Sequence, residues 1–276
     1  MSHPEYVLGT QSDELERLGF QHRLWSDAAH EVWKRAGIRR GDHVLDVGCG
    51  PGYASFDLAQ FVGSGGRVVG VDESPGFIEH LNRNAVARDL PQCHGLVGDV
   101  QHLSPTLYAT DAPASFDLAW ARWVLCFTPD PNAVIAGVAA ALRPGGRFVI
   151  HDYFNYETMT AAPRRDSWTA IVQATGLSWR ERGGDPDVMG RVPRMLVRNG
   201  LRLVHLTVHQ RVARPDDSMW QWGETWWRNY VPRLLTMGEI TPELHDQFFR
   251  DLDEMSRSET DFMVLPPVYE MIAEKV

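Results

Sequence analysis

Short apolar runs alternate with helical segments between residues 43 and 154, and this alternation constrains the fold of the 276-residue chain most strongly. The predicted strands cover residues 43–48, 67–72, 94–100, 115–121 and 147–154, and the predicted helices cover 53–62, 76–89 and 132–142. Strands that alternate with helices of about ten residues are typical of βαβ units. The segment therefore predicts an α/β fold built on a parallel sheet.

The residues on either side of this segment follow a different pattern. Residues 11–36 carry apolar side chains at helical spacing, which predicts one or two helices ahead of the sheet. Beyond residue 156 we predict helices over 164–175, 192–199, 219–235 and from Thr241 to about Met255, and strands over 201–212 and 262–275. The pair Pro266-Pro267 suits an edge or a break in the last strand.

A glycine-rich turn, Asp46-Val47-Gly48-Cys49-Gly50-Pro51-Gly52, joins the first predicted strand to the first predicted helix. Glycines let the chain turn sharply and let a ligand approach backbone N–H groups at a helix N-terminus. A dinucleotide-binding turn needs a glycine where this chain has Tyr53, and no Gly-Lys-Ser/Thr follows to make a phosphate loop. Asp46 either caps this turn or contacts the ligand that the turn binds.

The segment LDVGCGPG resembles motif I of the class I S-adenosylmethionine (SAM) dependent methyltransferases, and the resemblance covers roughly residues 37–154. It implies that Asp72 binds the ribose hydroxyls, that Asp99 lies near the adenine amino group, and that residues 121–123 lie beside the methionine moiety. Residues 142–146 match the turn before the fifth strand. The cofactor residues that it implies are Asp46, Gly48, Gly50, Gly52, Asp72, Glu73, Ser74, Asp99, Val100, Ala121, Arg122 and Trp123.

A carboxylate accepts two hydroxyl hydrogen bonds at once, which suits Asp72 to a ribose diol. The predicted strands end at the carboxyl edge of the sheet, where open α/β folds bind ligands. Asp72 and Asp99 could instead be ordinary residues of the turns that follow their strands.

The N-terminal and C-terminal segments resemble the branch that includes quinone-biosynthesis C-methyltransferases and small-metabolite methyltransferases. This narrower resemblance implies N-terminal helices over the SAM pocket. Gln21, Arg23 and Trp25 are candidates for closing it, with Gln21 and Trp25 as cofactor-binding residues, or for ordinary helix packing. It also implies a Rossmann-like, seven-stranded, mostly parallel sheet with an antiparallel last strand, which pairs with the strand at 201–212. The predicted division is lid helices 1–36, SAM-binding core 37–212, helical cap insertion 213–258 and last strand 259–276.

Two groups of side chains are candidates for catalysis and for binding an acceptor. His151 and Tyr153 end the fifth predicted strand on one side of it; His151 is the candidate general base, or else a structural histidine. Tyr156 orients the acceptor or packs in the interior. The predicted helix 219–235 is rich in tryptophan, which indicates either the core of a small cap or flat walls for an aromatic, polycyclic or cationic acceptor. The predicted acceptor-binding residues are Tyr156, Trp222, Trp226 and Tyr230, with Trp220 and Trp227 on another helix face.

Composition excludes several other classes of protein. A formal net charge of −9 without any basic run argues against a nucleic-acid partner. We find no secretory leader and no apolar run of membrane-spanning length, so we expect a cytoplasmic protein. The spacing of Cys49, Cys93 and Cys126 suggests neither a disulfide framework nor a zinc site, and no acidic set suggests another metal.

Together these observations predict a SAM-dependent methyltransferase that acts on a small molecule, either a secondary metabolite or a quinone-like compound. The alternative is an enzyme on the same scaffold that keeps SAM as an electrostatic or structural cofactor during a cyclisation, rearrangement or decarboxylation. A non-catalytic SAM-sensing protein is a third reading. The acceptor atom is left open, as is the choice between a monomer and a homodimer.

Overall fold

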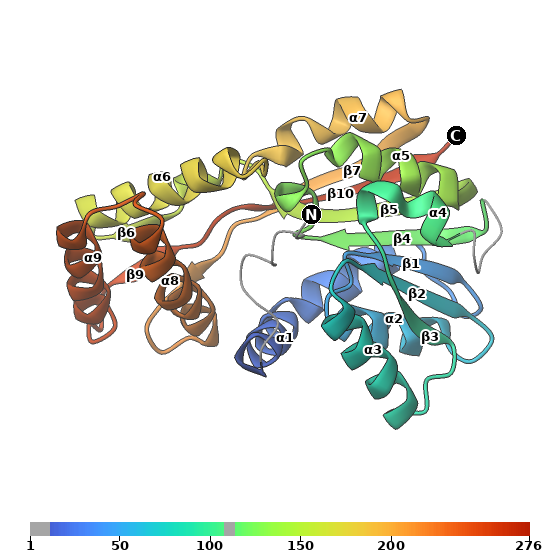
Figure 1. The fold of residues 1–276 in the computed structure, drawn as a ribbon, viewed down its shortest axis with the longest axis horizontal. Helices are drawn as coiled ribbons and strands as arrows, with labels where there is room; N and C mark the ends of the chain where they lie inside the picture. The colour runs from blue at the N-terminus through green and yellow to red at the C-terminus, as the bar shows by residue number, and fades with distance from the viewer. Residues whose placement is uncertain (1–11, 108–113) are drawn as a thin grey trace.

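The protein is represented by a computed structural model, which describes residues 12–107 and 114–276. A seven-stranded sheet in the order β3-β2-β1-β4-β5-β10-β7 forms its centre (Figure 1). The strands are β1 (His43–Val47), β2 (Arg67–Asp72), β3 (Cys93–Val97), β4 (Phe116–Arg122), β5 (Leu142–Tyr153), β7 (Leu201–His209) and β10 (Val268–Lys275). Strand β10 runs antiparallel to both β5 and β7, whereas the pairs among β1 to β5 are parallel. The predicted fold class is confirmed.

Helices cover both faces of this sheet, as Figure 1 shows. On one face lie α1 (Ser12–Arg35), α2 (Tyr53–Val62) and α3 (Pro75–Ala87), and on the other lie α4 (Leu103–Leu107), α5 (Pro131–Ala141) and α7 (Val192–Arg198). Strands buried on both faces are nearly continuous apolar runs, and β1 and β2 have this pattern. Two clusters of buried side chains result, one packed around Trp33 and Trp120 and the other around Phe116 and Phe148.

A second, smaller unit of structure lies beside the main sheet, at the left of Figure 1. Three short strands, β6 (Thr160–Ala162), β9 (Phe262–Val264) and β8 (Val212–Ala213), form a sheet in the order β6-β9-β8. Helices α6 (Asp166–Glu181), α8 (Ser218–Thr236) and α9 (Pro242–Met255) pack with one another beside it. We call residues 160–181 and 212–264 the cap.

The structure adds two differences in detail to the predicted arrangement of the chain. Residues 160–181, placed in the core by the prediction, pack with the helices of the predicted cap insertion, where Trp168 of α6 contacts Trp227 and Phe248. The predicted strand 262–275 is two strands, β9 in the cap sheet and β10 in the main sheet, separated at Pro266-Pro267. Helix periodicity does not show which distant helix a buried face will meet, so the sequence did not reveal the first difference.

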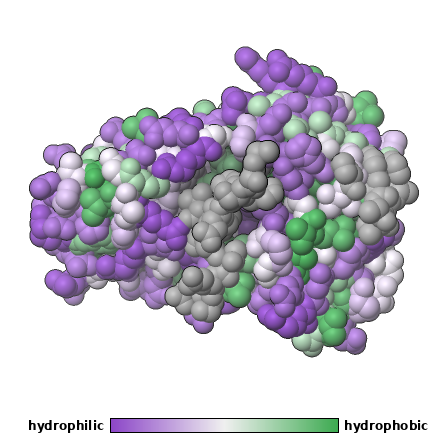
Figure 2. Space-filling model, viewed as in Figure 1, coloured by the Kyte–Doolittle hydropathy of each residue, from purple (hydrophilic) through white to green (hydrophobic). Residues whose placement is uncertain are grey.

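Helix α1 is continuous from Ser12 to Arg35, and residues 1–11 of the predicted N-terminal lid lie outside the described residues. The face in Figure 2 is mostly hydrophilic, with apolar residues in small separate groups. Among the described residues, no helix is both long and apolar enough to cross a membrane.

Candidate functional site

The turn between β1 and α2 is built on three glycines with positive φ, namely Gly48 (64°), Gly50 (53°) and Gly52 (89°). A Cβ added to Gly48 would lie 2.5 Å from Cγ2 of Val124, and one added to Gly52 would lie 2.5 Å from Cγ of Leu81. These two glycines are therefore required by close packing. A Cβ on Gly50 would have no described heavy atom within 4 Å, so this side of the turn is open to a ligand.

Asp72, at the end of β2, is fixed against this turn by two backbone donors. Its Oδ2 accepts a hydrogen bond from the Gly50 N–H at 2.9 Å, and its Oδ1 accepts one from the Ser74 N–H at 2.9 Å. Burial raises the pKa of Asp72 from its ordinary value. Ser74 also caps α3 by accepting from the Phe77 N–H, whereas Glu73 between them is exposed. The carboxylate is thus held at the open side of the glycine turn.

Asp99 follows β3, whose end is joined to β2 by a hydrogen bond from the Gly98 N–H to the Asp72 carbonyl at 2.9 Å. The Asp99 side chain is 42% exposed, and it accepts from the Gln101 N–H and pairs with His102 Nδ1 at 3.0 Å. It caps a short 3₁₀ helix that begins at Val100. Both oxygens of Asp99 already have partners, so a bound adenine would share this carboxylate with its own turn.

Two charged side chains, the buried Asp46 and the half-buried Arg122, lie near the ends of β1 and β4. Asp46 accepts a hydrogen bond from the Ser55 hydroxyl at 2.5 Å, and burial raises its pKa to about 7. Burial lowers the pKa of Arg122 to about 10, and the nearby Asp46 charge opposes this shift. Arg122 Nη2 donates to His22 Nδ1 at 2.9 Å, while Nη1 is buried with no described hydrogen-bond partner. A buried guanidinium with an unused donor is suited to an anionic ligand group.

His22 also ties α1 to α2. Its Nε2 lies 3.0 Å from Asp57 Oδ2, and His30 Nε2 lies 2.7 Å from the same oxygen. Burial lowers the pKa of His22, which fits a neutral ring that accepts from Arg122 and donates to Asp57. Sequence reasoning missed His22 and Asp57, which are separated by 35 residues; the spacing of His22 and His30 by two helical turns was the available signal.

An aromatic wall of four rings joins α1, the end of β4, the end of β5 and α8. Trp123 stacks on Tyr153 at 6.1 Å and on Trp222 at 5.8 Å between ring centroids. Trp25 packs edge-on against Trp123 at 5.4 Å and Trp222 at 5.5 Å. Gln21 accepts a hydrogen bond from Trp222 Nε1 at 2.9 Å. The structure therefore brings together predicted residues from four distant segments.

The backbone of Trp123 is unusual in this wall. Its φ is 54°, which bulky residues rarely adopt, and its N–H donates to the His151 carbonyl at 2.9 Å. Strained backbone of this kind costs of order 1–3 kcal/mol and is often found at functional sites. The tight turn directs the indole ring of Trp123 into its stacked position between Tyr153 and Trp222.

The other predicted acceptor residues continue the aromatic packing into the cap. Tyr156 contacts Tyr153 edge-on at 5.2 Å, and Trp226 stacks on Tyr230 at 4.7 Å. The Tyr230 side chain is fully buried, and its hydroxyl forms a hydrogen bond with Ser178 at 2.9 Å. The side chains of Tyr230 and Trp226 thus pack within the cap, whereas Trp222 faces the core.

His151, the predicted base, lies on β5 with no exposed surface. Its Nε2 pairs with Glu270 Oε2 at 2.9 Å, and its Nδ1 is buried without a described partner. Burial lowers the pKa of His151 to about 4, so the ring is neutral at pH 7. Sequence reasoning missed Glu270 and also His209, which pairs with the same Glu270 oxygen at 2.9 Å. Alternation along the strands could have placed each on a face, but not next to the others.

A pocket of about 560 Å³ opens beside the end of the glycine turn, between α1 and α8. Tyr53 lines it, together with residues of α1 and α8: Glu16, Arg17, Gly19, Phe20, Arg23, Gln221 and Thr225. Arg23 is the only predicted closing residue that lines this pocket; Gln21 and Trp25 contact the aromatic wall instead.

Residues 38–184 match a family model described as a methyltransferase domain, and the chain belongs to this family. This confirms the family predicted from the glycine turn and supports SAM as the cofactor.

The chain is 31% identical over 186 residues to "Methyltransferase GfsG" of Streptomyces halstedii, covering 67% of this chain and 62% of that protein. It is 26% identical to the ubiquinone/menaquinone biosynthesis C-methyltransferase UbiE of Francisella tularensis subsp. holarctica, covering 53% and 59%. The chain therefore spans less than two thirds of either relative.

The geranyl diphosphate C-methyltransferase of Streptomyces coelicolor A3(2) has a similar fold, with a TM-score of 0.58 and 16% identity over all of this chain and 86% of that one. That structure holds Mg²⁺, geranyl diphosphate and S-adenosyl-L-homocysteine. At this identity the likeness concerns the fold.

Proposed function

We propose that this protein is a SAM-dependent methyltransferase for a small-molecule acceptor with an aromatic or polycyclic skeleton. The observation that carries the proposal is the position of Asp72, whose two oxygens each accept one backbone N–H at the open side of Gly50. A carboxylate oxygen accepts more than one hydrogen bond, so both oxygens retain capacity for a ribose hydroxyl.

Arg122 and Asp46, which lie beyond the glycine turn, suit the methionine moiety of the same cofactor. The unused Nη1 donor of Arg122 would bind the carboxylate of the methionine moiety, and Asp46 would lie near its ammonium group. Asp46 and the Nη1 atom of Arg122 are buried, where a charged hydrogen bond is stronger than in water. His22 holds the guanidinium in place from α1.

The aromatic wall supports the proposed class of acceptor. Trp123, Tyr153 and Trp222 offer stacked rings next to the end of β4, and stacked or edge-on contacts of this kind favour flat apolar molecules. The rings contact one another in the described structure, so an acceptor would separate Trp222 of the cap from Trp123 of the core. Tyr156 would contribute to the same surface from the end of β5.

When bound, SAM supplies an electrophilic methyl group on a sulfonium centre, which an acceptor nucleophile displaces in line. The residues of this chain contribute by holding the two reactants in contact and by excluding water. Tyr153 lies in the wall, where its hydroxyl could orient an acceptor oxygen. His151 lies behind the wall with no exposed surface, and its role as a base stays a prediction.

Calorimetric titration of SAM, with NADH as the comparison ligand, tests the cofactor site. We expect SAM to bind and NADH not to bind, and Asp72→Ala to weaken SAM by about 1.5–3 kcal/mol, or roughly 10- to 150-fold. Glu79→Gln on exposed α3 surface is the matched control and should bind like the wild type. If Asp72→Ala bound SAM as tightly as the wild type, Asp72 would not be a SAM-binding residue.

Release of S-adenosylhomocysteine across a panel of flat aromatic, polycyclic and quinone-like acceptors tests the reaction. Stoichiometric release with one acceptor would establish methyl transfer. Turnover of a substrate while SAM remains intact would instead establish the alternative, in which SAM is a structural or electrostatic cofactor.

A further inference from the structure

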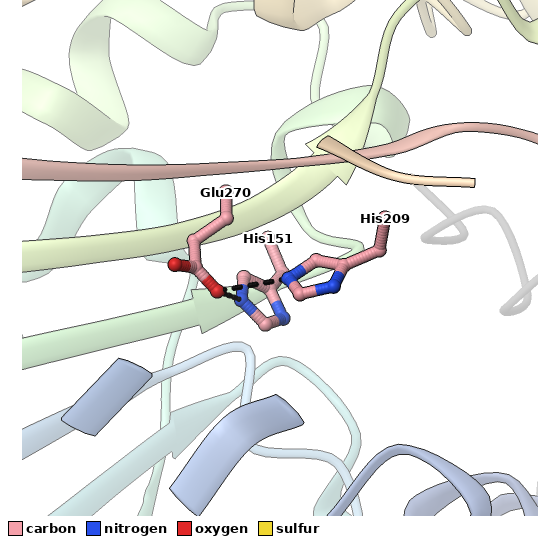
Figure 3. A group of neighbouring side chains, drawn as sticks. All are labelled: His151, His209 and Glu270. Atoms are coloured by element: carbon pink, nitrogen blue, oxygen red, sulfur yellow. Dashed lines mark hydrogen bonds and ion pairs between the residues drawn. The ribbon is translucent and has the colours of Figure 1, made fainter. Parts of the chain in front are cut away.

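Three neighbouring strands bring two histidines and a glutamate together in the main sheet. His151 of β5, Glu270 of β10 and His209 of β7 each offer one ligand atom, and these atoms all lie within 4.8 Å of one another (Figure 3). Glu270 is 119 residues from His151 and 61 from His209 along the chain. Because these residues lie far apart along the chain, no metal-ligand spacing is visible in the sequence, and the sequence analysis predicts no metal site.

We propose that His151, His209 and Glu270 form a binding site for one divalent transition-metal ion. The proposal does not rest on methyl transfer, because it concerns side chains of the sheet that the SAM site does not use. A set of two imidazoles and one carboxylate favours ions such as Zn²⁺, Co²⁺ or Fe²⁺ over Mg²⁺ or Ca²⁺.

The spacing of the three groups suits such an ion. Glu270 Oε2 lies 2.9 Å from His151 Nε2 and 2.9 Å from His209 Nε2. Two ligands at about 2.1 Å from one metal ion are separated by about 3.0 Å at right angles and about 3.4 Å in a tetrahedron. An ion could therefore replace the two hydrogen bonds after small side-chain shifts. Each ring would then carry its proton on Nδ1 and coordinate through Nε2.

Burial and charge point the same way. The His151 and Glu270 side chains are 0% and 4% exposed, and His209 is 27% exposed, which leaves a way in for an ion and for water ligands. A neutral imidazole and an ionised carboxylate are the forms of these side chains that bind a metal ion.

The surroundings hold the carboxylate in position. His205 Nε2 pairs with the other Glu270 oxygen, Oε1, at 2.9 Å, and Arg35 Nη1 lies 3.8 Å from it. Outer contacts of this type orient ligands in metal sites. The ring of His209 meets Trp25 edge-on at 6.4 Å, so the proposed ion lies directly behind the aromatic wall.

Metal binding is tested with the full chain after dialysis against a chelator. Titration calorimetry with Zn²⁺ and Co²⁺, and visible spectra of the Co²⁺ form, should show one ion per chain, with a dissociation constant in the micromolar range or below, and no comparable binding of Mg²⁺. His209→Asn should weaken binding at least tenfold. The matched control His245→Asn, on α9 beside Asp246, should leave it unchanged.

Glu270→Gln provides a second ligand variant, and circular dichroism verifies that each variant is folded. Absence of Zn²⁺ and Co²⁺ binding by the wild type, or equal binding by wild type and folded His209→Asn, would overturn the proposal and leave a purely hydrogen-bonded network. The two roles considered for His151, general base and metal ligand, predict different results for His151→Ala. A base role predicts lost turnover in His151→Ala with metal affinity retained, whereas a ligand role predicts that metal affinity is lost.

Discussion

The glycine turn of the core and the aromatic cap, which we propose as two sides of one site, are held in place by different physical means. At the turn, the positions of Gly48, Gly52 and Asp72 depend on backbone angles and backbone hydrogen bonds within a short stretch of sheet edge. In the cap, Trp168, Trp227 and Phe248 come from three helices and are held by ring packing alone. The turn is specified locally, whereas the cap exists only once distant helices have met.

The comparison implies that the two regions can be damaged separately. A substitution in the cap should lower the free energy of unfolding while leaving SAM affinity almost intact. A substitution at Gly50, where the turn faces open space, should weaken SAM binding with a smaller loss of stability. The following changes test this separation, beginning with the largest effect.

Trp227→Ala should give the largest loss of stability. The side chain is fully buried between Trp168 and Phe248, and removing a buried tryptophan costs about 3–5 kcal/mol. Urea unfolding measures the loss, and calorimetry should find SAM affinity within about twofold of the wild type. Leu177→Ala, at an exposed position of α6, is the control and should change stability by less than about 0.5 kcal/mol. An equal loss of SAM affinity in Trp227→Ala would show that cap and turn are coupled.

Gly48→Ala and Gly50→Ala separate packing from ligand contact within the turn. The first places a Cβ 2.5 Å from Val124 in a left-handed conformation and should cost about 2–4 kcal/mol of folding stability. The second places its Cβ in open space and should cost only about 1–2 kcal/mol of folding stability, yet it should weaken SAM binding at least tenfold. Chemical unfolding and calorimetry report the two effects. If Gly50→Ala bound SAM normally, the open side of the turn would not be the ligand side.

Lowering the pH should reduce the free energy of unfolding through protonation of His151. Its folded pKa of about 4 lies below the ordinary value of 6.5, so the unfolded chain takes up a proton first as the pH falls. The stability from a neutral buried ring is fully present above pH 6.5 and declines toward pH 4, by at most about 3 kcal/mol. Unfolding free energies from pH 7 to 4 should therefore fall more steeply in the wild type than in His151→Gln. Parallel curves would contradict this account.

Gln21→Leu should produce the smallest effect, at the contact between α1 and the cap. It removes the acceptor for Trp222 Nε1 and should cost about 0.5–1.5 kcal/mol. We expect a raised KM for the acceptor with SAM affinity unchanged, because the bond holds the wall and not the cofactor side. Thermal unfolding together with steady-state kinetics measures both. A changed SAM affinity would instead place Gln21 in the cofactor site, as the sequence predicts.

Much of the cofactor side followed from sequence because its determinants are local. Alternating strands and helices predicted a parallel sheet, and the glycine spacing located the turn beside Asp46 and Asp72. The start of α9 was predicted from Thr241 and Pro242, since capping depends on adjacent residues. The strand beginning at Leu201 is confirmed, and so is its antiparallel pairing with the last strand, which the family resemblance implied.

The sequence by itself thus determined the family, the sheet and the position of the glycine turn, because each depends on neighbours along the chain. Only the tertiary structure decided that α6 joins the cap, that Trp25, Trp123 and Trp222 meet, and that Glu270 lies between His151 and His209. These contacts depend on strand register and helix packing across more than fifty residues. Periodicity places a side chain on a face of its own element, but the side chain that faces it is set by how the whole chain packs.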